Sequence, residues 1–473
     1  MFDLTVHGQG ILKKSRFGHF YHRDGTTCAY HAYKIITLYF GAELFRFLNA
    51  VLDVPPVQAL TAVPGALRPE FERVLGEICD VGIFVPQDYD ETKYLLQTRG
   101  AAFTGPAVRV LVLHLTDFCN LDCGYCFIEG NIPACYQRQD MPPAVMEQAL
   151  LKFNSITSSR ALPKTPSVVF YGGEPLANWK TMKHGLQFMA RAQQEGRIRS
   201  DFDKVLITNG TLVTQGIAAE LAAHQVMVSL SLDGPREIND INRKFRGGQG
   251  SFDAALRGFH LLRQAGVRPT VSCVLSKDSL PHAPQIIRWL LGELGVKALG
   301  FNHVSIVPRV HEYDPEYEAG FGRALLQVQE IIQQEFPGIY ERRMSHKIRT
   351  FTNREILRAD CTGCGEQMSV SPDGKIGICQ GYMGSRKTFD ACVFDESFDP
   401  STDPVFVEWA NRSPLNMPEC FDCPALSTCG GGCPRNADVL HGSIWQVDSA
   451  FCHFATAAQE WLIWKQYENK TKK

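Results

Sequence analysis

The sequence of 473 residues lacks an excess of charge of either sign and lacks any long apolar run. Its 48 basic and 50 acidic residues give a formal net charge of −2, which gives no electrostatic case for nucleic acid or an anionic membrane. No apolar stretch approaches the length of a membrane-spanning helix. Residues 1–8 lack a basic region followed by an apolar one, so we expect no signal peptide. We therefore expect a soluble globular protein with neither nucleic-acid nor membrane partners.

Cysteine is the residue of which the chain has an unusual amount. There are 16 cysteines, three within residues 119–126 and nine between residues 361 and 452. Disulfide scaffolds are seldom so unevenly distributed, and a long chain without an export signal favours metal or redox use. The length predicts two or three domains.

The chain is organised around an apolar run, Leu111–Leu115, that ends in Cys119, Cys123 and Cys126. Thiolates are soft ligands that select iron–sulfur clusters, zinc or copper(I). A 4Fe–4S cluster normally takes four cysteines, so three in the spacing C-x3-C-x2-C would leave one iron open for chemistry. Zinc sites usually show paired C-x2-C halves. A zinc knuckle or three unrelated thiols remain the alternatives.

This triplet, with Tyr125 before its last cysteine, resembles the radical S-adenosylmethionine enzymes. The resemblance implies that Cys119, Cys123 and Cys126 hold a 4Fe–4S cluster whose fourth iron binds the amino and carboxylate groups of S-adenosylmethionine. Reductive cleavage would then yield methionine and a 5′-deoxyadenosyl radical, which abstracts hydrogen from the substrate. An electron donor such as flavodoxin or ferredoxin is implied. No catalytic residue is assigned beyond the cluster.

Between residues 106 and 345, strand-like and helix-like segments alternate, which predicts an α/β fold with a parallel sheet and helices outside it. Six such units fit a partial (β/α)6 barrel, with the site at the carboxyl ends of the strands. The predicted strands are Val108–Leu115, Ser167–Tyr171, Lys204–Thr208, Val226–Leu232, Thr270–Val274 and Ala298–Val304. The predicted helices include Pro143–Ile156, Thr214–Ala223, Phe252–Ala265, Pro284–Leu294 and Phe321–Gln334.

The second predicted strand is followed by Gly172, Gly173, Glu174 and Pro175. Two glycines let the backbone approach a ligand closely, and a glutamate can accept hydrogen bonds from an ammonium group. The run resembles the GGEP motif, which holds the amino group of S-adenosylmethionine in the family. Asn209 follows the third strand and is assigned to the same cofactor, although a plain turn is the alternative.

The fourth strand leads to Ser231 and Asp233, with Arg243 further along. By the same resemblance, Ser231 and Arg243 contact the ribose or carboxylate of S-adenosylmethionine. The arginine fork matches two carboxylate oxygens. A solvated helix position is the alternative for Arg243, and Asp233 is either substrate-facing or an ordinary turn residue.

The C-terminal region, residues 346–473, is rich in cysteine. The segment Ser371-Pro-Asp-Gly374 is a turn signal that places Cys379 on the second strand of a hairpin. The pattern resembles the SPASM domain, which carries two auxiliary 4Fe–4S clusters. That resemblance implies one cluster on Cys361, Cys364, Cys379 and Cys433 and another on Cys420, Cys423, Cys429 and Cys452. Zinc bound by four cysteines is the alternative. We expect structural roles for the other thiols, Cys28, Cys79, Cys135, Cys273 and Cys392.

Residues 1–105 precede the radical core, which spans residues 106–345. A hairpin over Phe17–Tyr33 turning at Asp24-Gly25, helices at Ala42–Val51 and Arg68–Cys79, and a strand at Gly82–Pro86 predict a small α+β, winged-helix-like unit. It resembles the leader-peptide recognition domains of peptide-modifying radical enzymes. A structural extension that merely covers the core is the alternative.

SPASM enzymes mostly modify peptides or proteins. Sulfatase-activating members carry an Asp base after the residue corresponding to Cys379, where this chain has Gln380. We therefore expect a peptide maturase that forms an intramolecular cross-link, a thioether, in a ribosomally made peptide. The alternatives are a protein maturase of the sulfatase-activating or subunit cross-linking type, action on a small molecule, and a non-catalytic iron–sulfur electron-transfer protein. The family implies a reducing bacterial cytoplasm.

Overall fold

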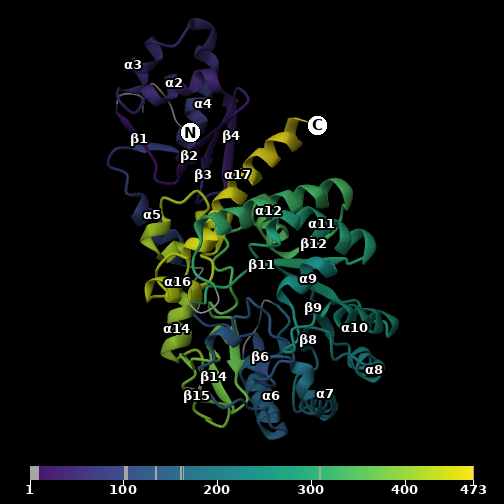
Figure 1. The fold of residues 1–473 in the computed structure, drawn as a ribbon. Coiled ribbons are helices and arrows are strands. Elements are labelled where there is room, and N and C mark those ends of the chain that lie inside the picture. Colours follow the sequence, from purple (N-terminus) through teal and green to yellow (C-terminus); the bar gives the residue numbers. More distant parts are fainter. Residues whose placement is uncertain are drawn as a thin grey trace.

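The computed structural model describes residues 10–100, 105–133, 136–159, 162, 164–307 and 311–471. Its centre is a ten-stranded sheet in the order β12-β11-β10-β9-β8-β7-β6-β13-β14-β15 (Figure 1). The six predicted core strands are all present and run parallel, each beside the next in the chain. They are β6 (Val110–His114), β7 (Ser167–Tyr171), β8 (Asp203–Thr208), β9 (Met227–Ser231), β10 (Thr270–Leu275) and β11 (Ala298–His303).

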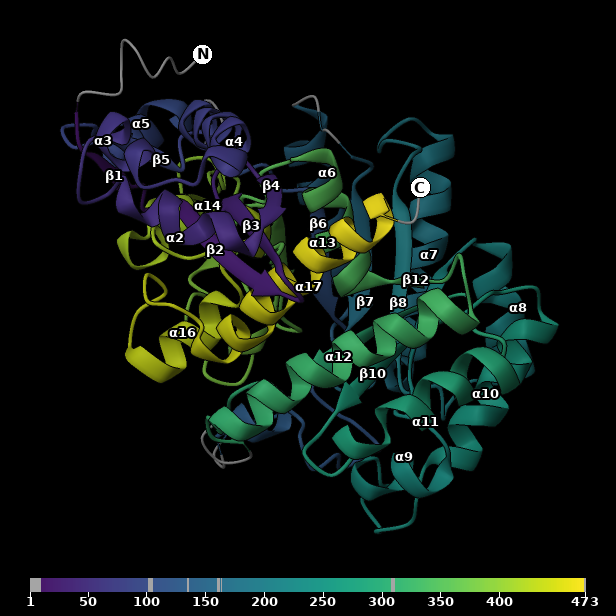
Figure 2. The ribbon, with the colours of Figure 1, turned by 90° about the horizontal axis from the view of Figure 1, so that it is seen from above.

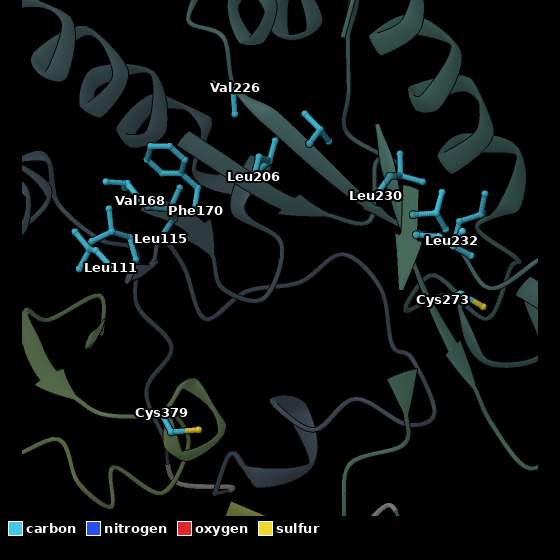
Figure 3. Packing of buried hydrophobic residues seen from close by; sticks show 14 of the residues in the cluster. Leu111, Leu115, Val168, Phe170, Leu206, Val226, Leu230, Leu232, Cys273 and Cys379 are labelled. Carbon is cyan, nitrogen blue, oxygen red and sulfur yellow. The ribbon is translucent and has the colours of Figure 1, made fainter. Parts of the chain in front are cut away.

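Apart from β6, which is buried along its whole length, the core strands alternate in burial, because successive side chains point to opposite faces of a sheet. Val168 and Phe170 of β7 are fully buried on the helix-covered face, and Figure 3 shows them beside Leu206 of β8. The residues between them are only half-buried. These half-buried side chains face the inside of the partial barrel, so the inner surface of the sheet is less tightly covered than the outer one.

Helices cover the outer face of the parallel strands, as the sequence predicts (Figure 1). They are α6 (Pro143–Ser158), α7 (Trp179–Gln194), α8 (Gln215–Ala223), α9 (Arg236–Asn242), α10 (Phe252–Gln264), α11 (Ala283–Arg288) and α12 (Pro315–Glu335). Helix α7 was not among the predicted helices. The helix predicted over Pro284–Leu294 is α11 followed by a π-helical turn, Trp289–Glu293. Within the described ranges, no helix is both long enough and apolar enough to cross a membrane.

The cysteine-rich C-terminal region shares the central sheet. Strand β13 (Gln367–Val370) pairs in parallel with β6, and β14 (Lys375–Gly377) turns back beside it at the predicted Pro-Asp-Gly turn. Short β12 (Tyr340–Glu341) and β15 (Ala391–Cys392) form the two edges. The remaining elements are helical: α13 (Arg342–Asn353), α14 (Pro404–Asn411), α15 (Leu426–Cys429), α16 (Pro434–His441) and α17 (Ser449–Thr471).

The N-terminal residues form the expected α+β unit. The predicted hairpin is β2 (Gly18–Arg23) and β3 (Thr26–His31), and Asp24 and Gly25 turn it with positive φ angles of 47° and 75°. A third strand, β4 (Ile36–Gly41), completes an antiparallel sheet. The other elements are β1 (Leu12–Lys14), α2 (Ala42–Ala50), α3 (Pro56–Thr61), α4 (Arg68–Val81), β5 (Phe84–Pro86) and α5 (Glu91–Thr98).

The N-terminal unit packs on the last helix of the chain. Tyr30 of β3 belongs to the same buried apolar cluster as Leu462, Ile463 and Trp464 of α17. The Tyr39 hydroxyl donates to the Ile463 carbonyl oxygen at 2.7 Å. Figure 2 shows α17 between this unit and helices α12 and α13. The two ends of the chain therefore share one apolar core.

Trp464 is 2% exposed in this shared core. We expect Trp464→Ala to lower the free energy of unfolding by about 3–5 kcal/mol, because truncating a buried Trp leaves a cavity. Denaturant midpoints would be compared with those of Asn469→Ala, an exposed position on the same helix. Equal midpoints for the two variants would contradict the shared core.

Candidate functional site

The three cysteines of the triplet lie in the loop that follows the carboxyl end of β6. The backbone N–H of Leu121 donates to Cys119 Sγ at 3.4 Å, and that of Glu129 donates to Cys126 Sγ at 3.5 Å. The pKa of Cys119 is raised to about 12, chiefly by burial and in addition by the negative charges of Glu174, Cys123 and Cys126. The three thiols are thus close enough to interact electrostatically. Such thiols need a bound cation to ionise, which fits a metal-cluster site.

The glycine pair after β7 lies directly against the cysteine loop. A Cβ on Gly172, whose φ is +145°, would lie 2.6 Å from the Thr116 carbonyl oxygen. A Cβ on Gly173 would lie 2.2 Å from the Phe118 carbonyl oxygen. Both contacts are far shorter than real Cβ atoms tolerate, so only glycine permits this approach. The Gly173 N–H donates to the Thr116 carbonyl oxygen at 2.8 Å and holds the two loops together.

Glu174 joins the ends of two strands. Its carboxylate accepts hydrogen bonds from the Leu176 N–H at 3.0 Å, the Thr208 hydroxyl at 2.7 Å and the Asn209 N–H at 2.8 Å. The side chain is buried, and that burial raises its pKa. The chain itself supplies these three donors, so the expected contact with an ammonium group stays a prediction.

Asn209 is buried next to the triplet. Its side-chain Nδ2 donates to Asn120 Oδ1 at 3.0 Å and lies 3.9 Å from Cys119 Sγ. Its Oδ1 accepts from both the backbone N–H and the hydroxyl of Thr211. The turn that Asn209 occupies is therefore fastened to the cysteine loop. This placement brings the predicted residue to the candidate site without testing its contact with the cofactor.

Arg243 is buried, so the alternative of a solvated helix position is wrong. Its Nε donates to Asp233 Oδ2 at 2.9 Å, and its guanidinium carbon lies 5.5 Å from the centre of the Tyr125 ring. The Tyr125 hydroxyl also donates to Asp233. Burial opposes the charge of Arg243, but Asp233, Tyr125 and Cys123 hold its pKa well above the usual value.

The sequence did not predict the hydrogen bond between Tyr125 and Asp233. It left two roles for Asp233, an ordinary turn residue or a residue that faces the substrate. Asp233 Oδ1 also accepts from the Val274 N–H at 2.9 Å, so this carboxylate ties β9 to β10. Ser231 ends β9 and is half-buried on the inner face of the sheet. Because Tyr125 precedes Cys126, the Asp233–Arg243 pair holds the cysteine loop at a second point, in addition to the glycine pair.

The eight C-terminal cysteines influence one another's pKa values in two sets of four, and the binding of a cluster by each set stays a prediction. In the first, burial raises the pKa of Cys361, and the nearby thiolates of Cys364 and Cys379 also raise it. Burial likewise raises the pKa of Cys433, to which the charges of Cys361 and Cys379 contribute. In the second, burial raises the pKa of Cys452, and the charges of the other three members raise it further; those members are Cys420, Cys423 and Cys429. Four buried or half-buried thiols in each group suit a 4Fe–4S cluster.

Three of the thiols outside these groups pack as the sequence predicts. Cys28 and Cys273 are fully buried among apolar residues, and Cys79 packs at the edge of the N-terminal core. Cys392 lies half-buried on β15, and Cys135 lies outside the described residues. In the part of the chain that the structure describes, no group of three or more His, Cys, Asp or Glu is spaced to hold a single metal ion.

Two buried arginines beside the C-terminal cysteines were missed in the sequence. Arg412 donates to the carbonyl oxygens of Gly431, at 2.7 Å, and Gln446, at 3.2 Å. Its positive charge lowers the pKa of Cys364 and of Cys420, although burial raises both by more. Arg435 donates to the Gly381 carbonyl oxygen at 3.0 Å and acts on Cys379 in the same way. Buried cations bonded to neutral acceptors favour a nearby anion, and a thiolate-ligated cluster is an anion.

The comparisons with known proteins agree with this geometry. Residues 113–290 match the Radical SAM superfamily. The fold and the site define a radical S-adenosylmethionine enzyme. The chain therefore carries a radical SAM domain, and the proteins it is similar to include sulfatase-maturating enzymes and a cyclopropyl synthase. The alternative of a non-catalytic electron-transfer protein is therefore set aside.

Two curated relatives illustrate the similarity. The radical SAM cyclopropyl synthase TigE of Paramaledivibacter caminithermalis is 24% identical over 74% of this chain and 72% of its own. A cysteine-type anaerobic sulfatase-maturating enzyme of Clostridium perfringens is 24% identical over 72% of this chain and 92% of its own. Among solved structures, Streptococcus suis SuiB bound to the precursor peptide SuiA has a TM-score of 0.54 at 15% identity, covering 93% of this chain and 99% of SuiB. SuiB therefore shares the fold.

The buried pair of Asp233 and Arg243 can be compared with an exposed pair, Asp253 and Arg236. We expect Asp233→Ala to lower the free energy of unfolding by about 3–5 kcal/mol, because it leaves a buried guanidinium without its partner. Asp253→Ala, which breaks the exposed pair, should leave stability nearly unchanged. Denaturant unfolding of both variants measures the difference, and equal small effects would show that Arg243 is not held as described.

Proposed function

We propose that this radical S-adenosylmethionine enzyme is a peptide maturase that forms an intramolecular thioether cross-link in a ribosomally made peptide. The observation that carries the proposal is the combination of three features in one fold. These are the cysteine triplet at the end of β6, two groups of four buried or half-buried cysteines, and an N-terminal α+β unit that packs on α17. The proposed units remain residues 1–105, 106–345 and 346–473.

The proposed cofactor site lies at the carboxyl ends of β6–β9. Cys119, Cys123 and Cys126 would hold the 4Fe–4S cluster that binds S-adenosylmethionine, and the bound cofactor would supply the 5′-deoxyadenosyl radical. The glycine pair would let the backbone of the β7 loop approach the amino group. The Arg243 guanidinium would donate two hydrogen bonds to the carboxylate of S-adenosylmethionine, while Asp233 holds the guanidinium in place. Asn209 and Ser231 complete the proposed contacts, together with Glu174 and Pro175.

The two C-terminal cysteine groups are proposed to hold auxiliary 4Fe–4S clusters. Joining a C–H carbon to a thiol sulfur removes two hydrogen atoms from the peptide. One leaves as a hydrogen atom, and the other leaves as a proton and an electron. The electron needs an acceptor, which an auxiliary cluster can be. All four ligands of each group come from the protein, which favours electron transfer over direct substrate binding.

The N-terminal unit is the proposed recognition element for the peptide. In its described three-stranded sheet, β2 and β4 are the edges, and an extended peptide can add a strand to such an edge. A cavity of about 480 Å³ lies beside the β1–β5 pair and is lined by Leu12, Phe17, Phe84 and Tyr94 among others. The SuiB structure that shares this fold contains a precursor peptide, which supports a peptide substrate here.

A sulfatase-activating role is the second candidate, because sulfatase-maturating enzymes are among the relatives. The residue after Cys379 argues against it. The Gln380 Oε1 accepts from Gln367 Nε2 at 2.6 Å, and an amide has no carboxylate to take up a proton. The coverage also differs, since the sulfatase-maturating relative matches nearly all of its own length but under three quarters of this chain.

Mass spectrometry of a short peptide encoded beside the gene tests the function. The peptide is co-expressed anaerobically with the enzyme, and we expect it to lose two hydrogen atoms and one alkylatable cysteine. Cys119→Ala should abolish both changes. A product whose cysteines all remain alkylatable would rule out the thioether. An unchanged mass with continued release of 5′-deoxyadenosine would rule out this peptide as substrate.

Metal analysis tests the assignment of the cysteines. Three 4Fe–4S clusters predict about twelve irons per chain. A Cys361→Ala, Cys364→Ala double variant should lose about four of them, since one cluster loses half of its ligands. The control is Cys28→Ala with Cys273→Ala, which alters two thiols buried in apolar cores and should retain all the iron. Zinc in the purified enzyme, in place of iron at these positions, would overturn the assignment.

A further inference from the structure

The cavity of the N-terminal unit is joined to the second C-terminal cysteine group by one arginine. Ser15 and Phe17 line this cavity of about 480 Å³, and Arg16 lies between them in the chain. The loop of residues 420–423, here called the ligand loop, begins and ends at two cysteines of the second group. Nε and Nη2 of Arg16 donate to the two carboxylate oxygens of Asp422 in this loop, at 3.0 and 3.1 Å. The cavity wall therefore contacts the ligand loop directly.

Arg16 is also held from within the N-terminal unit. Its backbone N–H donates to the Glu91 carboxylate at 2.7 Å, and its Nη1 donates to the Thr92 hydroxyl at 2.6 Å. Glu91 pairs in addition with Lys13 at 3.3 Å. Two cations and two carboxylates, with Asp422 as the second, thus balance each other in this contact. Arg16 connects the first turn of α5 to the ligand loop.

Apolar packing reinforces the ion pair between Arg16 and Asp422. The Asp422 side chain is 69% exposed, so the ion pair alone contributes little. The neighbouring Phe421 is buried, and the Arg16 guanidinium carbon lies 5.2 Å from the centre of its ring. Phe17 of the cavity wall belongs to the same buried apolar cluster as Phe421. The ligand loop is therefore part of the core beneath the cavity.

A second contact joins the cavity to the same cysteine group. Ser427 lies on α15, which ends at Cys429, and its buried hydroxyl donates to the Tyr33 carbonyl oxygen at 2.9 Å. The Tyr33 ring packs 5.7 Å from Phe17 and 6.0 Å from Tyr94, measured between ring centres. Both of these aromatic residues line the cavity. Two separate stretches of chain between cysteines of the second group thus support one cavity wall.

We propose that the second auxiliary cluster is coupled to the cavity of the N-terminal unit through the ligand loop, so that loading the cluster fixes the cavity wall. The proposal rests on the second auxiliary cluster and the recognition role of the proposed function. Ligation at Cys420 and Cys423 would restrict both ends of the ligand loop, and with them Phe421 and Asp422. Coupling between two sites is reciprocal, so a fixed cavity wall in turn helps to retain the cluster.

Hydrogen–deuterium exchange of the full-length enzyme under anaerobic conditions tests the coupling. The Cys420→Ala, Cys423→Ala double variant should lose about four irons. We expect exchange in residues 15–18 and 91–95 to become about fivefold faster, because the ligand loop no longer holds Arg16. The control is the Cys361→Ala, Cys364→Ala double variant, which alters the first group beside β13 in the central sheet and should leave these exchange rates unchanged. Equal rates in the two double variants would overturn the proposal.

Arg16→Gln tests the same coupling with every cysteine in place. We expect about four of the irons to be released to a chelator about fivefold faster than from the unaltered enzyme, because the coupling acts in both directions. Arg73→Gln is the matched control, since Arg73 pairs at 2.8 Å with Glu77 inside α4 of the same unit. It should leave iron release unchanged. Identical release from the two variants would overturn the proposal even where the Cys420→Ala, Cys423→Ala variant fails to fold.

The outcome for the proposed function is read separately. An unchanged peptide mass, in an enzyme whose iron release still depends on Arg16, would contradict the proposed function and support the coupling. A modified peptide, with iron release that does not depend on Arg16, would support the function and overturn the coupling.

Discussion

The close approach of two backbones at the carboxyl ends of β6 and β7 is the constraint on which the site depends. Gly172 and Gly173 leave no room for a Cβ against Thr116 and Phe118, and Cys119 is the next residue after Phe118. The cysteine loop is thus positioned by main-chain atoms, which vary less in position than long side chains do. Glu174 extends the same contact to the end of β8 through three hydrogen bonds.

A second set of contacts acts on the same loop from β9 and β10. Tyr125 lies within it and is held by Asp233, which also binds Arg243 and the backbone of β10. Asp233 and Arg243 are buried and Tyr125 is half-buried beside them, so each depends on the charge or hydrogen bond of the others. The loop is therefore held at two separate points by the ends of rigid strands, which is the arrangement that a cluster site needs for a fixed geometry.

The sequence predicted what is local and repetitive. The core strands are short apolar runs bounded by turn residues, and the cysteine groups have fixed spacing, so both could be read without coordinates. The contacts between distant residues could not. The Tyr125 hydroxyl donates to Asp233, which lies 108 residues further along the chain, and no periodic pattern in the sequence predicts such a pair. Arg412 and Arg435 have polar side chains that composition places at the surface, yet both are buried because backbone carbonyls accept their hydrogen bonds.

Helix α7 shows a different limit of sequence reasoning. Its buried residues Met182, Leu186 and Met189 are spaced as one helical face, but lysine, histidine and glutamine separate them and weaken the pattern. The hairpin of β13 and β14 was predicted as a unit, whereas its pairing with β6 was not. Tertiary packing determines which strands pair in parallel when they lie more than 250 residues apart, and local sequence propensity does not predict it.

The pairing of β13 with β6 has a mechanical consequence. The strand that leads into the cysteine triplet and the strand between Cys364 and Cys379 are hydrogen-bonded neighbours, so the triplet and the first group of C-terminal cysteines belong to a single rigid frame. A hinge between them would have to break the sheet. The distance between the cysteine triplet and the first group of C-terminal cysteines is therefore set by the sheet itself, and it stays the same as long as the β6–β13 hydrogen bonds hold.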